Sequence, residues 1–181
     1  MPEDQFDALK LDNQICFPLY AASRLIVQAY RPYLERLGVT YLQYLTLMVL
    51  WENDGSTVSE IGDRLMLDSG TLTPVLKRLA TDGVIKRRRS GDDDRVVQNW
   101  LTARGRTLKT RAVDIPTQLL CSTTVELDEV SRLKSALAPV LDKLVGAARR
   151  TSRAPHGSTR DDRAPTVRAR RAGPAPRGRA P

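Results

Sequence analysis

The residues of this 181-residue chain that can take part in the widest range of reactions are its two cysteines. Cys16 and Cys121 are 105 positions apart, and the chain has no CxxC pair, so a thioredoxin-like site is not expected. Two cysteines in a cytoplasmic chain are most often reduced, buried thiols. The alternative is a reactive thiolate, which attacks the O–O bond of a peroxide and becomes a sulfenic acid. Spacing alone favours the first interpretation and leaves the second open.

The residues near Cys16 favour the reactive interpretation. The chain has only five tyrosines, and Tyr20, Tyr30, Tyr41 and Tyr44 lie within a short span that follows Cys16. Phenolic O–H groups can donate hydrogen bonds to a thiolate and so favour its charged form. The alternative is that these tyrosines are core aromatics whose hydroxyls have ordinary partners.

The net charge of +8 lies in two places. Residues 149–181 hold ten arginines and two aspartates, so the preceding 148 residues are neutral as a whole. Within those residues, the segment Lys77–Arg111 has eleven basic and four acidic residues, an excess that suits a polyanion such as DNA. The segment from Arg149 has almost no large apolar residue and is predicted to be a disordered tail. It either has no function or adds a salt-dependent attraction to phosphate.

Several function classes are excluded by what the chain lacks. No apolar stretch approaches the ~18 residues that cross a bilayer, and the acidic start of the chain is unlike a secretion signal. One histidine and two cysteines are too few for an ordinary zinc site, which usually takes four such ligands. We therefore expect a cytoplasmic protein with no metal, no cofactor and no membrane contact.

Residues 1–148 are predicted to form one mainly α domain. Apolar residues at helical spacing predict helices at 19–33, 41–51, 58–65, 70–81, 103–112 and about 128–148. Thr102 is expected to cap the fifth of these, and Pro116 to kink or end it. Residues 84–88 and 96–101 are predicted to be two strands, which the polar loop between them joins as a hairpin.

Two short helices followed by a basic hairpin have the layout of a winged helix-turn-helix, with the DNA-binding lobe at about residues 55–102. Ser69 is expected to cap the second helix, whose polar face presents Thr71, Thr73, Lys77 and Arg78. Small hydroxyls near a helix N-terminus and long cations farther along suit base edges and phosphates in a major groove. The alternative is an ordinary solvated helix face.

Three stretches of the sequence resemble a known family. Asp93-Asp94-Arg95, five further residues and Leu101-Thr102 are similar to the wing signature of the MarR family of bacterial regulators. The runs LDSGTLTPVLKRL at 67–79 and LDNQICF at 11–17 resemble one branch of it, the OhrR repressors that sense organic hydroperoxides. The resemblance covers about residues 6–145 and leaves the tail without a counterpart.

The resemblance implies a homodimeric transcriptional repressor, not an enzyme. Its terminal helices would form the dimer interface, and its two winged lobes would bind an inverted-repeat operator in double-stranded DNA. The residues implied to line the major groove are Ser69, Thr71, Thr73, Pro74, Lys77 and Arg78. Arg95 would reach an adjacent minor groove, and Asp93 would orient it.

The resemblance also assigns roles to the cysteines and tyrosines. Cys16 matches the peroxide sensor, which tyrosines matching Tyr30 and Tyr41 reach from the partner subunit, while a tyrosine matching Tyr20 lies close by. Cys121 matches the resolving cysteine of the two-cysteine members. There an intersubunit disulfide, here Cys16 with Cys121, moves the lobes and releases the operator. Apolar surroundings of the sensor favour organic hydroperoxides over hydrogen peroxide as the oxidant.

Two departures from the family pattern concern helix starts. Pro18 stands where an apolar helix former is usual, so the helix could begin there or be kinked. Leu42 replaces a proline that is common after the tyrosine matching Tyr41, which leaves the start of that helix less firmly fixed. Two other functions stay open at this point, a thiol peroxidase that turns over at Cys16 and a MarR-type regulator with a noncovalent phenolic effector.

Overall fold

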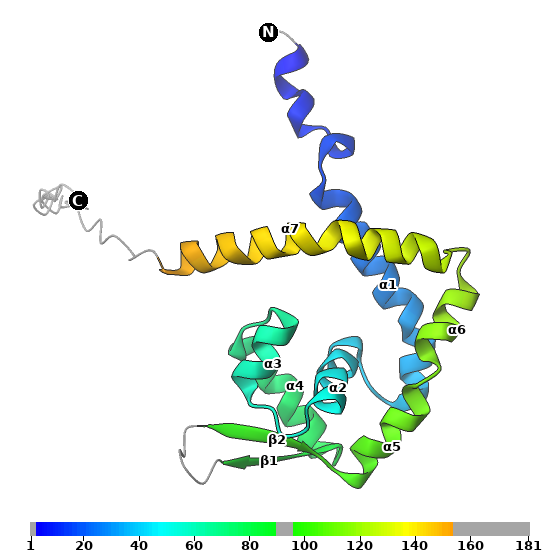
Figure 1. Ribbon diagram of the computed structural model, residues 1–181, viewed down its shortest axis with the longest axis vertical. Coiled ribbons are helices and arrows are strands. Elements are labelled where there is room, and N and C mark those ends of the chain that lie inside the picture. Colours follow the sequence, from blue (N-terminus) through cyan, green and yellow to red (C-terminus); the bar gives the residue numbers. More distant parts are fainter. Residues whose placement is uncertain (1–2, 90–95, 154–181) are drawn as a thin grey trace, which may run out of the picture. The chain divides into compact units, whose positions relative to one another are not determined.

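The computed structural model describes residues 3–89 and 96–153, and Figure 1 shows their helices and strands. Two short 3-10 segments, η1 (Glu3–Leu9) and η2 (Leu11–Asn13), precede the first α-helix. The α-helices are α1 (Cys16–Leu37), α2 (Tyr41–Glu52), α3 (Val58–Leu65), α4 (Ser69–Thr81), α5 (Ala103–Ala112), α6 (Ile115–Ser122) and α7 (Leu127–Arg153). The strands are β1 (Ile85–Arg89) and β2 (Val97–Leu101). The mainly α class and the winged helix-turn-helix order are therefore confirmed.

Side-chain caps set the starts of α2 and α3. Thr40 accepts a hydrogen bond from the backbone N–H of Gln43 (3.3 Å), and the Gln43 side chain accepts one from the N–H of Thr40 (2.8 Å). Thr57 and Glu60 form the same reciprocal capping box at α3. The start of α2 is thus fixed without the proline that Leu42 replaces.

Asp68, not Ser69, is the N-cap of α4, so the expected cap was wrong by one residue. The Asp68 carboxylate accepts from both the N–H and the hydroxyl of Thr71, each at 2.8 Å. These two hydrogen bonds favour the charged form and lower the pKa of Asp68. Ser69 becomes the first residue of the helix and lies on its exposed surface.

Helix α1 is longer than the sequence pattern predicted. It begins at Cys16, which places Pro18 in the first turn. Backbone N–H groups in the first turn have no acceptor within the helix, so the N–H that proline lacks costs no hydrogen bond there. It continues through Pro32 and ends before Gly38, whose left-handed φ of 73° allows the N–H groups of Gly38 and Val39 to bond back to the last turn. Pro18 therefore lies in the first turn of the helix and does not interrupt it.

The two strands form an antiparallel hairpin, the wing, in which Ile85 pairs with Leu101 and Arg89 with Val97. Each strand lies within one residue of its predicted position. A short segment before α3 covers the outer edge of β2, because Asn99 donates from its N–H to the carbonyl of Ser56 and its own carbonyl accepts from the N–H of Gly55, both at 3.0 Å. The edge of the wing is thereby protected near its root.

The core of the lobe forms around α2, which α3, α4, α5 and β2 contact on different sides (Figure 1). The most deeply buried apolar side chains come from α2, α3, α4 and β1, and they are Leu47, Leu50, Ile61, Leu72, Leu76, Leu79 and Ile85. α2 is apolar almost all round, as the sequence indicated, because it is buried on most of its surface.

Helix α5 holds the ends of three other helices through its cations. The donor and acceptor pairs are Arg111 with the carbonyl of Arg36 in α1 (2.7 Å), Lys109 with that of Trp51 in α2 (2.9 Å), and Arg104 with that of Asp82 after α4 (2.9 Å). The last carbonyls of a helix lack intrahelical donors and carry partial negative charge, so a cation stabilises them. These cations belong to the basic excess in 77–111, and here they are paired within the protein.

The C-terminal part of the chain differs from expectation in two ways. Thr102 caps α5, which ends before Pro116 as predicted, but Pro116 then occupies the first turn of α6, a helix that the sequence pattern did not predict. α7 passes through Pro139 and ends at Arg153, so it extends five residues into the segment assigned to the tail. The remaining tail residues lie outside the described part of the chain.

The chain divides into two compact units, 1–130 and 131–181, which are described separately. In the second unit α7 exposes large apolar side chains, including Leu133, Val140, Leu141 and Leu144. Within 3–89 and 96–153, no helix combines the length and the hydropathy that crossing a membrane requires.

The packing of α5 against the wing requires glycine at position 105, because a Cβ there would collide with the carbonyl oxygen of Val84 and lie 3.0 Å from the Leu101 side chain. We expect Gly105→Ala to lower the free energy of unfolding by about 1–3 kcal/mol, as overpacking usually does. Urea unfolding measures it. Thr110→Ala, an exposed change on the same helix, is the control and should stay within about 0.5 kcal/mol. Equal stability of the two variants would contradict the close packing at Gly105.

The cap of α4 makes a pH-dependent contribution to stability. Since the pKa of Asp68 is lowered in the folded protein, its contribution is complete above the unfolded pKa of about 3.9 and is lost as pH falls through the folded pKa. Asp68→Asn keeps a capping oxygen without the charge. Thermal unfolding should show the wild type more stable than this variant at pH 6, with the difference shrinking below about pH 4. A difference independent of pH would contradict the role of the charge.

Candidate DNA interface and redox site

Helix α4 presents the predicted recognition residues on the side away from the core. Its buried stripe is Leu72, Leu76 and Leu79. Of the predicted DNA-binding residues on α4, Thr73 is half-buried and the others are exposed, namely Ser69, Thr71, Pro74, Lys77 and Arg78. The side chains are thus brought to one helix, with small polar groups near its N-terminus and two cations farther along.

Several of these side chains already have partners within the protein. The hydroxyl of Thr71 donates to Asp68, and that of Thr73 donates to the carbonyl of Ser69 at 2.6 Å, which leaves the oxygen lone pairs free to accept. Arg78 is paired through Nε with Asp82 at 3.0 Å. Its remaining guanidinium N–H groups are a donor set that a phosphate can use.

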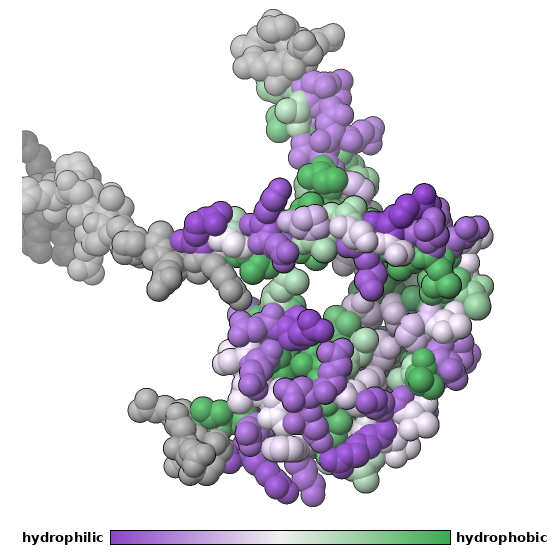
Figure 2. All heavy atoms as spheres, in the orientation of Figure 1, coloured by the Kyte–Doolittle hydropathy of each residue, from purple (hydrophilic) through white to green (hydrophobic). Residues whose placement is uncertain are grey.

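The wing adds cations that the sequence analysis did not single out as site residues. Lys86 and Arg88 point to the same face of β1 by strand alternation, and both are exposed. A run of four basic residues in a strand was the available signal. Asp93 and Arg95, the predicted wing-tip residues, lie outside the described residues. Figure 2 shows hydrophilic side chains over much of the visible face of the lobe, with hydrophobic ones between them.

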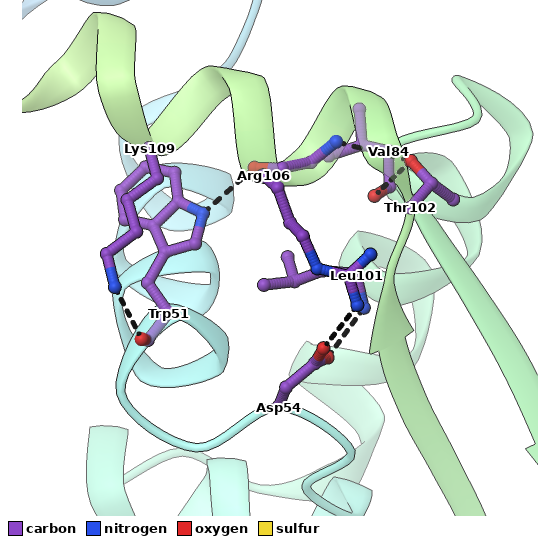
Figure 3. Close-up of polar contacts among 8 residues, drawn as sticks. Trp51, Asp54, Val84, Leu101, Thr102, Arg106 and Lys109 are labelled. Carbon is purple, nitrogen blue, oxygen red and sulfur yellow. Dashed lines mark hydrogen bonds and ion pairs between the residues drawn. The ribbon is translucent and has the colours of Figure 1, made fainter.

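Polar contacts connect the root of the wing to the turn between α2 and α3, and connect that turn and α2 to α5 (Figure 3). The Asp54 carboxylate accepts from the N–H of Leu101 at 2.7 Å and pairs with Arg106 at 3.0 Å. The indole N–H of Trp51 donates to the carbonyl of Gly105 at 3.0 Å. Thr102 donates from its hydroxyl to the carbonyls of Gly83 and Val84. Sequence reasoning missed Asp54, whose only local signal is a turn.

Cys16 lies in the first turn of α1 and is exposed. Its sulfur is 4.0 Å from the side-chain oxygen of Gln14. Tyr20, one turn later on the same helix, is also exposed, and Arg24 lies over its ring, 5.7 Å from the centroid, with a guanidinium nitrogen 3.4 Å from its hydroxyl. Because Tyr20 follows Cys16 by four positions on α1, the two residues share one face of the helix.

Tyr30, Tyr41 and Tyr44 form a separate cluster at the C-terminal half of α1. The ring of Tyr30 lies 5.2 Å from that of Tyr41 and 5.8 Å from that of Tyr44. Burial raises the pKa of all three phenols, and the neighbouring phenols contribute for Tyr30 and Tyr44. They therefore stay protonated well above neutral pH and remain hydrogen-bond donors.

The helix itself separates Cys16 from this cluster. Tyr30 follows Cys16 by fourteen positions of α1, a rise of about 21 Å. Cys16, Tyr20, Ser23, Val27 and Tyr30 follow one another at alternating steps of four and three, so they share one stripe of the helix. Within one chain, Tyr30 and Tyr41 cannot donate to the sulfur.

Cys121 is likewise exposed and remote from Cys16 in the same chain. It lies on α6, which packs against the C-terminal half of α1, where the Tyr33 hydroxyl donates to the carbonyl of Gln118 at 3.3 Å. Counting along the two helices from this contact leaves about 21 Å or more between the levels of Cys121 and Cys16. A disulfide needs Cα atoms within about 4.4–6.8 Å, so the two thiols of one chain are not positioned to pair.

A surface groove of about 710 Å³ lies beside the tyrosine cluster, between α1 and the start of α2. Polar and apolar residues both line it, namely Ser23, Arg24, Val27, Gln28, Arg31, Leu34, Glu35, Val39, Thr40 and Tyr41. α1 also exposes Phe17, Leu19, Leu25 and Ile26. Figure 2 shows hydrophobic side chains at the surface of the N-terminal helical segments, between hydrophilic ones. Such exposed apolar surface is typical of a face that another chain covers.

Comparisons with known proteins agree with this architecture. A family model described as transcriptional regulator SarA/Rot matches residues 28–112. The organic hydroperoxide resistance transcriptional regulator of Bacillus subtilis is 48% identical over 142 residues, which are 78% of this chain and 97% of the relative.

Solved structures of AbfR from Staphylococcus epidermidis are similar in both sequence and fold. The reduced protein bound to DNA gives a TM-score of 0.67 at 37% identity and covers 80% of this chain and 99% of that one. The disulfide form gives 0.56 at 36% identity and covers 81% and 99%. The chain accordingly belongs to the MarR family of DNA-binding transcriptional repressors, in the branch of the organic hydroperoxide resistance regulators, and it is not an enzyme.

Proposed function

We propose that this chain acts as a cytoplasmic homodimer that binds an inverted-repeat operator and releases it when an organic hydroperoxide oxidises Cys16. Cys121 of the partner subunit then resolves the oxidised sulfur as a disulfide. The observation that carries this proposal is the separation of about 21 Å along α1 between an exposed thiol and a cluster of protonated phenols. Each half of the site is incomplete in one chain and can be completed by a second copy.

A two-fold axis would bring the two halves together. In an isologous interface each contact occurs twice, so Cys16 opposite Tyr30 of the partner subunit places the axis near Ser23, halfway between them on the stripe. The exposed apolar residues of α1 would be covered in such a pairing. Phenols from the partner could then donate hydrogen bonds to the Cys16 thiolate, whose place in the first turn of α1 also favours an anion.

The proposed chemistry consumes one hydroperoxide for each disulfide formed. The Cys16 thiolate attacks the terminal oxygen of ROOH, the O–O bond breaks, an S–O bond forms, and the alcohol ROH leaves after taking a proton. The sulfur is oxidised to a sulfenic acid and the peroxide is reduced. The thiol of Cys121 then attacks the Cys16 sulfur, an S–S bond forms, and the oxygen leaves as water. The aliphatic side chains of Val27, Leu34 and Val39 in the groove beside Tyr41 favour an oxidant with an organic substituent.

Disulfide formation would require backbone movement, which supplies the proposed switch. Because the bond holds Cα atoms within about 4.4–6.8 Å, it would displace α6 relative to α1 of the other subunit. Half-sites one helical turn apart, about 34–36 Å, require both recognition helices at a fixed spacing. A rotation of either lobe would therefore prevent simultaneous contact with both half-sites.

The sensor role of Cys16 is tested by Cys16→Ser. We expect this variant to bind DNA from the region upstream of its own gene as the wild type does, because residue 16 lies outside the DNA-binding lobe. Cumene hydroperoxide should lower the affinity of the wild type at least tenfold and leave that of Cys16→Ser unchanged, as read by electrophoretic mobility shift. Release of the variant by peroxide would show that another group is the sensor.

The role of Cys121 is tested with mixed dimers. Cys16→Ser and Cys121→Ser chains of different length are combined, so that a heterodimer has one Cys16 on one chain and one Cys121 on the other. After peroxide treatment, a nonreducing gel should show a covalent heterodimer, because the proposed disulfide crosses the interface. Neither variant alone should give this species. Its absence, or a disulfide within one wild-type chain, would overturn the pairing.

A further inference from the structure

We infer that Asp54 is a positioning residue for DNA binding, because its carboxylate fixes the root of the wing at the angle that brings the wing to DNA. The inference rests on the proposed DNA interface, in which the wing contacts DNA beside the recognition helix.

Asp54 lies in the turn between α2 and α3, and its two oxygens bind two different elements (Figure 3). Oδ1 accepts from the N–H of Leu101, the last residue of β2, at 2.7 Å. Oδ2 accepts from Arg106 in α5 at 3.0 Å. The Asp54 side chain is 27% exposed and Leu101 is 8% exposed, so the first of these contacts is shielded from solvent. Both are charge-assisted, which makes them stronger than neutral hydrogen bonds.

The carboxylate completes a row of hydrogen bonds along the outer edge of β2. Two residues before Leu101, the N–H and the carbonyl of Asn99 pair with Ser56 and Gly55. The N–H of Leu101 points to the same edge by strand periodicity. Asp54 takes the place of the next backbone carbonyl there, so β2 stays paired up to its last residue. Removing the carboxylate leaves a buried N–H without its acceptor and frees the end of the strand.

The second oxygen connects the wing to a rigid support. Arg106 belongs to α5, whose other cations bind the C-terminal ends of α1, α2 and α4. One carboxylate therefore joins the root of the wing to the element that also holds the end of the recognition helix. The orientation of the wing relative to α4 depends on this connection.

A small change at the root is enlarged along the hairpin. Leu101 follows Val97 by four positions, a span of about 13 Å, so a tilt of about 10° at the root moves the far end by about 2 Å. Hydrogen bonds to phosphate tolerate only a few tenths of an ångström. The wing should therefore release its phosphates before α4 does, because α4 has its own cap and its own place in the core.

The test compares Asp54→Ala with the wild type by hydroxyl-radical footprinting and by the salt dependence of the dissociation constant, on a duplex from the region upstream of the protein's own gene. We expect the variant to lose protection at the flanks while keeping protection in the half-site centres. The slope of log K against log salt should fall by about one for each phosphate that the wing no longer binds, with roughly tenfold weaker binding. A merely destabilised protein would lower the active fraction and leave the slope and the flanking protection unchanged.

Arg111→Gln is the matched control, because it removes another tie of α5 that does not reach the wing, and its slope and footprint should match the wild type. Asp54→Asn keeps an acceptor for Leu101, so it should restore part of the flanking protection, and it serves as the test variant if Asp54→Ala does not fold. Full flanking protection and an unchanged slope in Asp54→Ala would overturn the inference but not the proposed function. If Asp54→Ala does not fold, the same result in both Arg106→Gln and Asp54→Asn would overturn it. Absence of flanking protection in the wild type would overturn the proposed wing contact and this inference with it.

Discussion

The cations of α5 and the carbonyls at the ends of its neighbours are the interactions on which the lobe depends. Arg111, Lys109 and Arg104 each bind the C-terminal end of a different helix. These ends carry partial negative charge and have no intrahelical donors, so one basic helix satisfies three such ends at once. Gly105 of α5 also packs against Val84 and Leu101 at the root of the wing, so the recognition helix and the wing are held by the same helix.

The length of α1 imposes the second constraint. A straight helix keeps residues on one stripe in a fixed order and at a fixed spacing, so Cys16 and the cluster of Tyr30, Tyr41 and Tyr44 cannot meet within one chain. Cys121 is equally remote from Cys16. Within one chain, Cys16 is thus far from its proposed hydrogen-bond donors and from its proposed resolving thiol. The proposed chemistry therefore requires an interface between two subunits.

Local sequence signals predicted the elements that depend on local interactions. The helix at Val58–Leu65 and the cap at Thr102 were correct, and both strands were within one residue, because periodicity and capping act over a few residues. Asp54 and α6 were missed. The partner of Asp54 is 47 residues away, which no local pattern contains. The basic residues of α5 were counted in the basic excess that the sequence analysis related to DNA. Composition alone cannot distinguish a cation that binds phosphate from one that binds a backbone carbonyl.

Helix α2 connects the two constraints. At its start Tyr41 contacts Tyr30. Near its end lies Trp51, whose ring is 6.0 Å from that of Tyr44 and whose indole N–H and carbonyl both bind α5. Most of its side chains between these points are buried, and a close-packed helix moves as a unit rather than bending residue by residue. A displacement imposed at the phenol cluster would therefore also act on the support of the wing. The tyrosines proposed for peroxide sensing and the carboxylate proposed for DNA geometry are both anchored by the same buried helix and the elements packed on it.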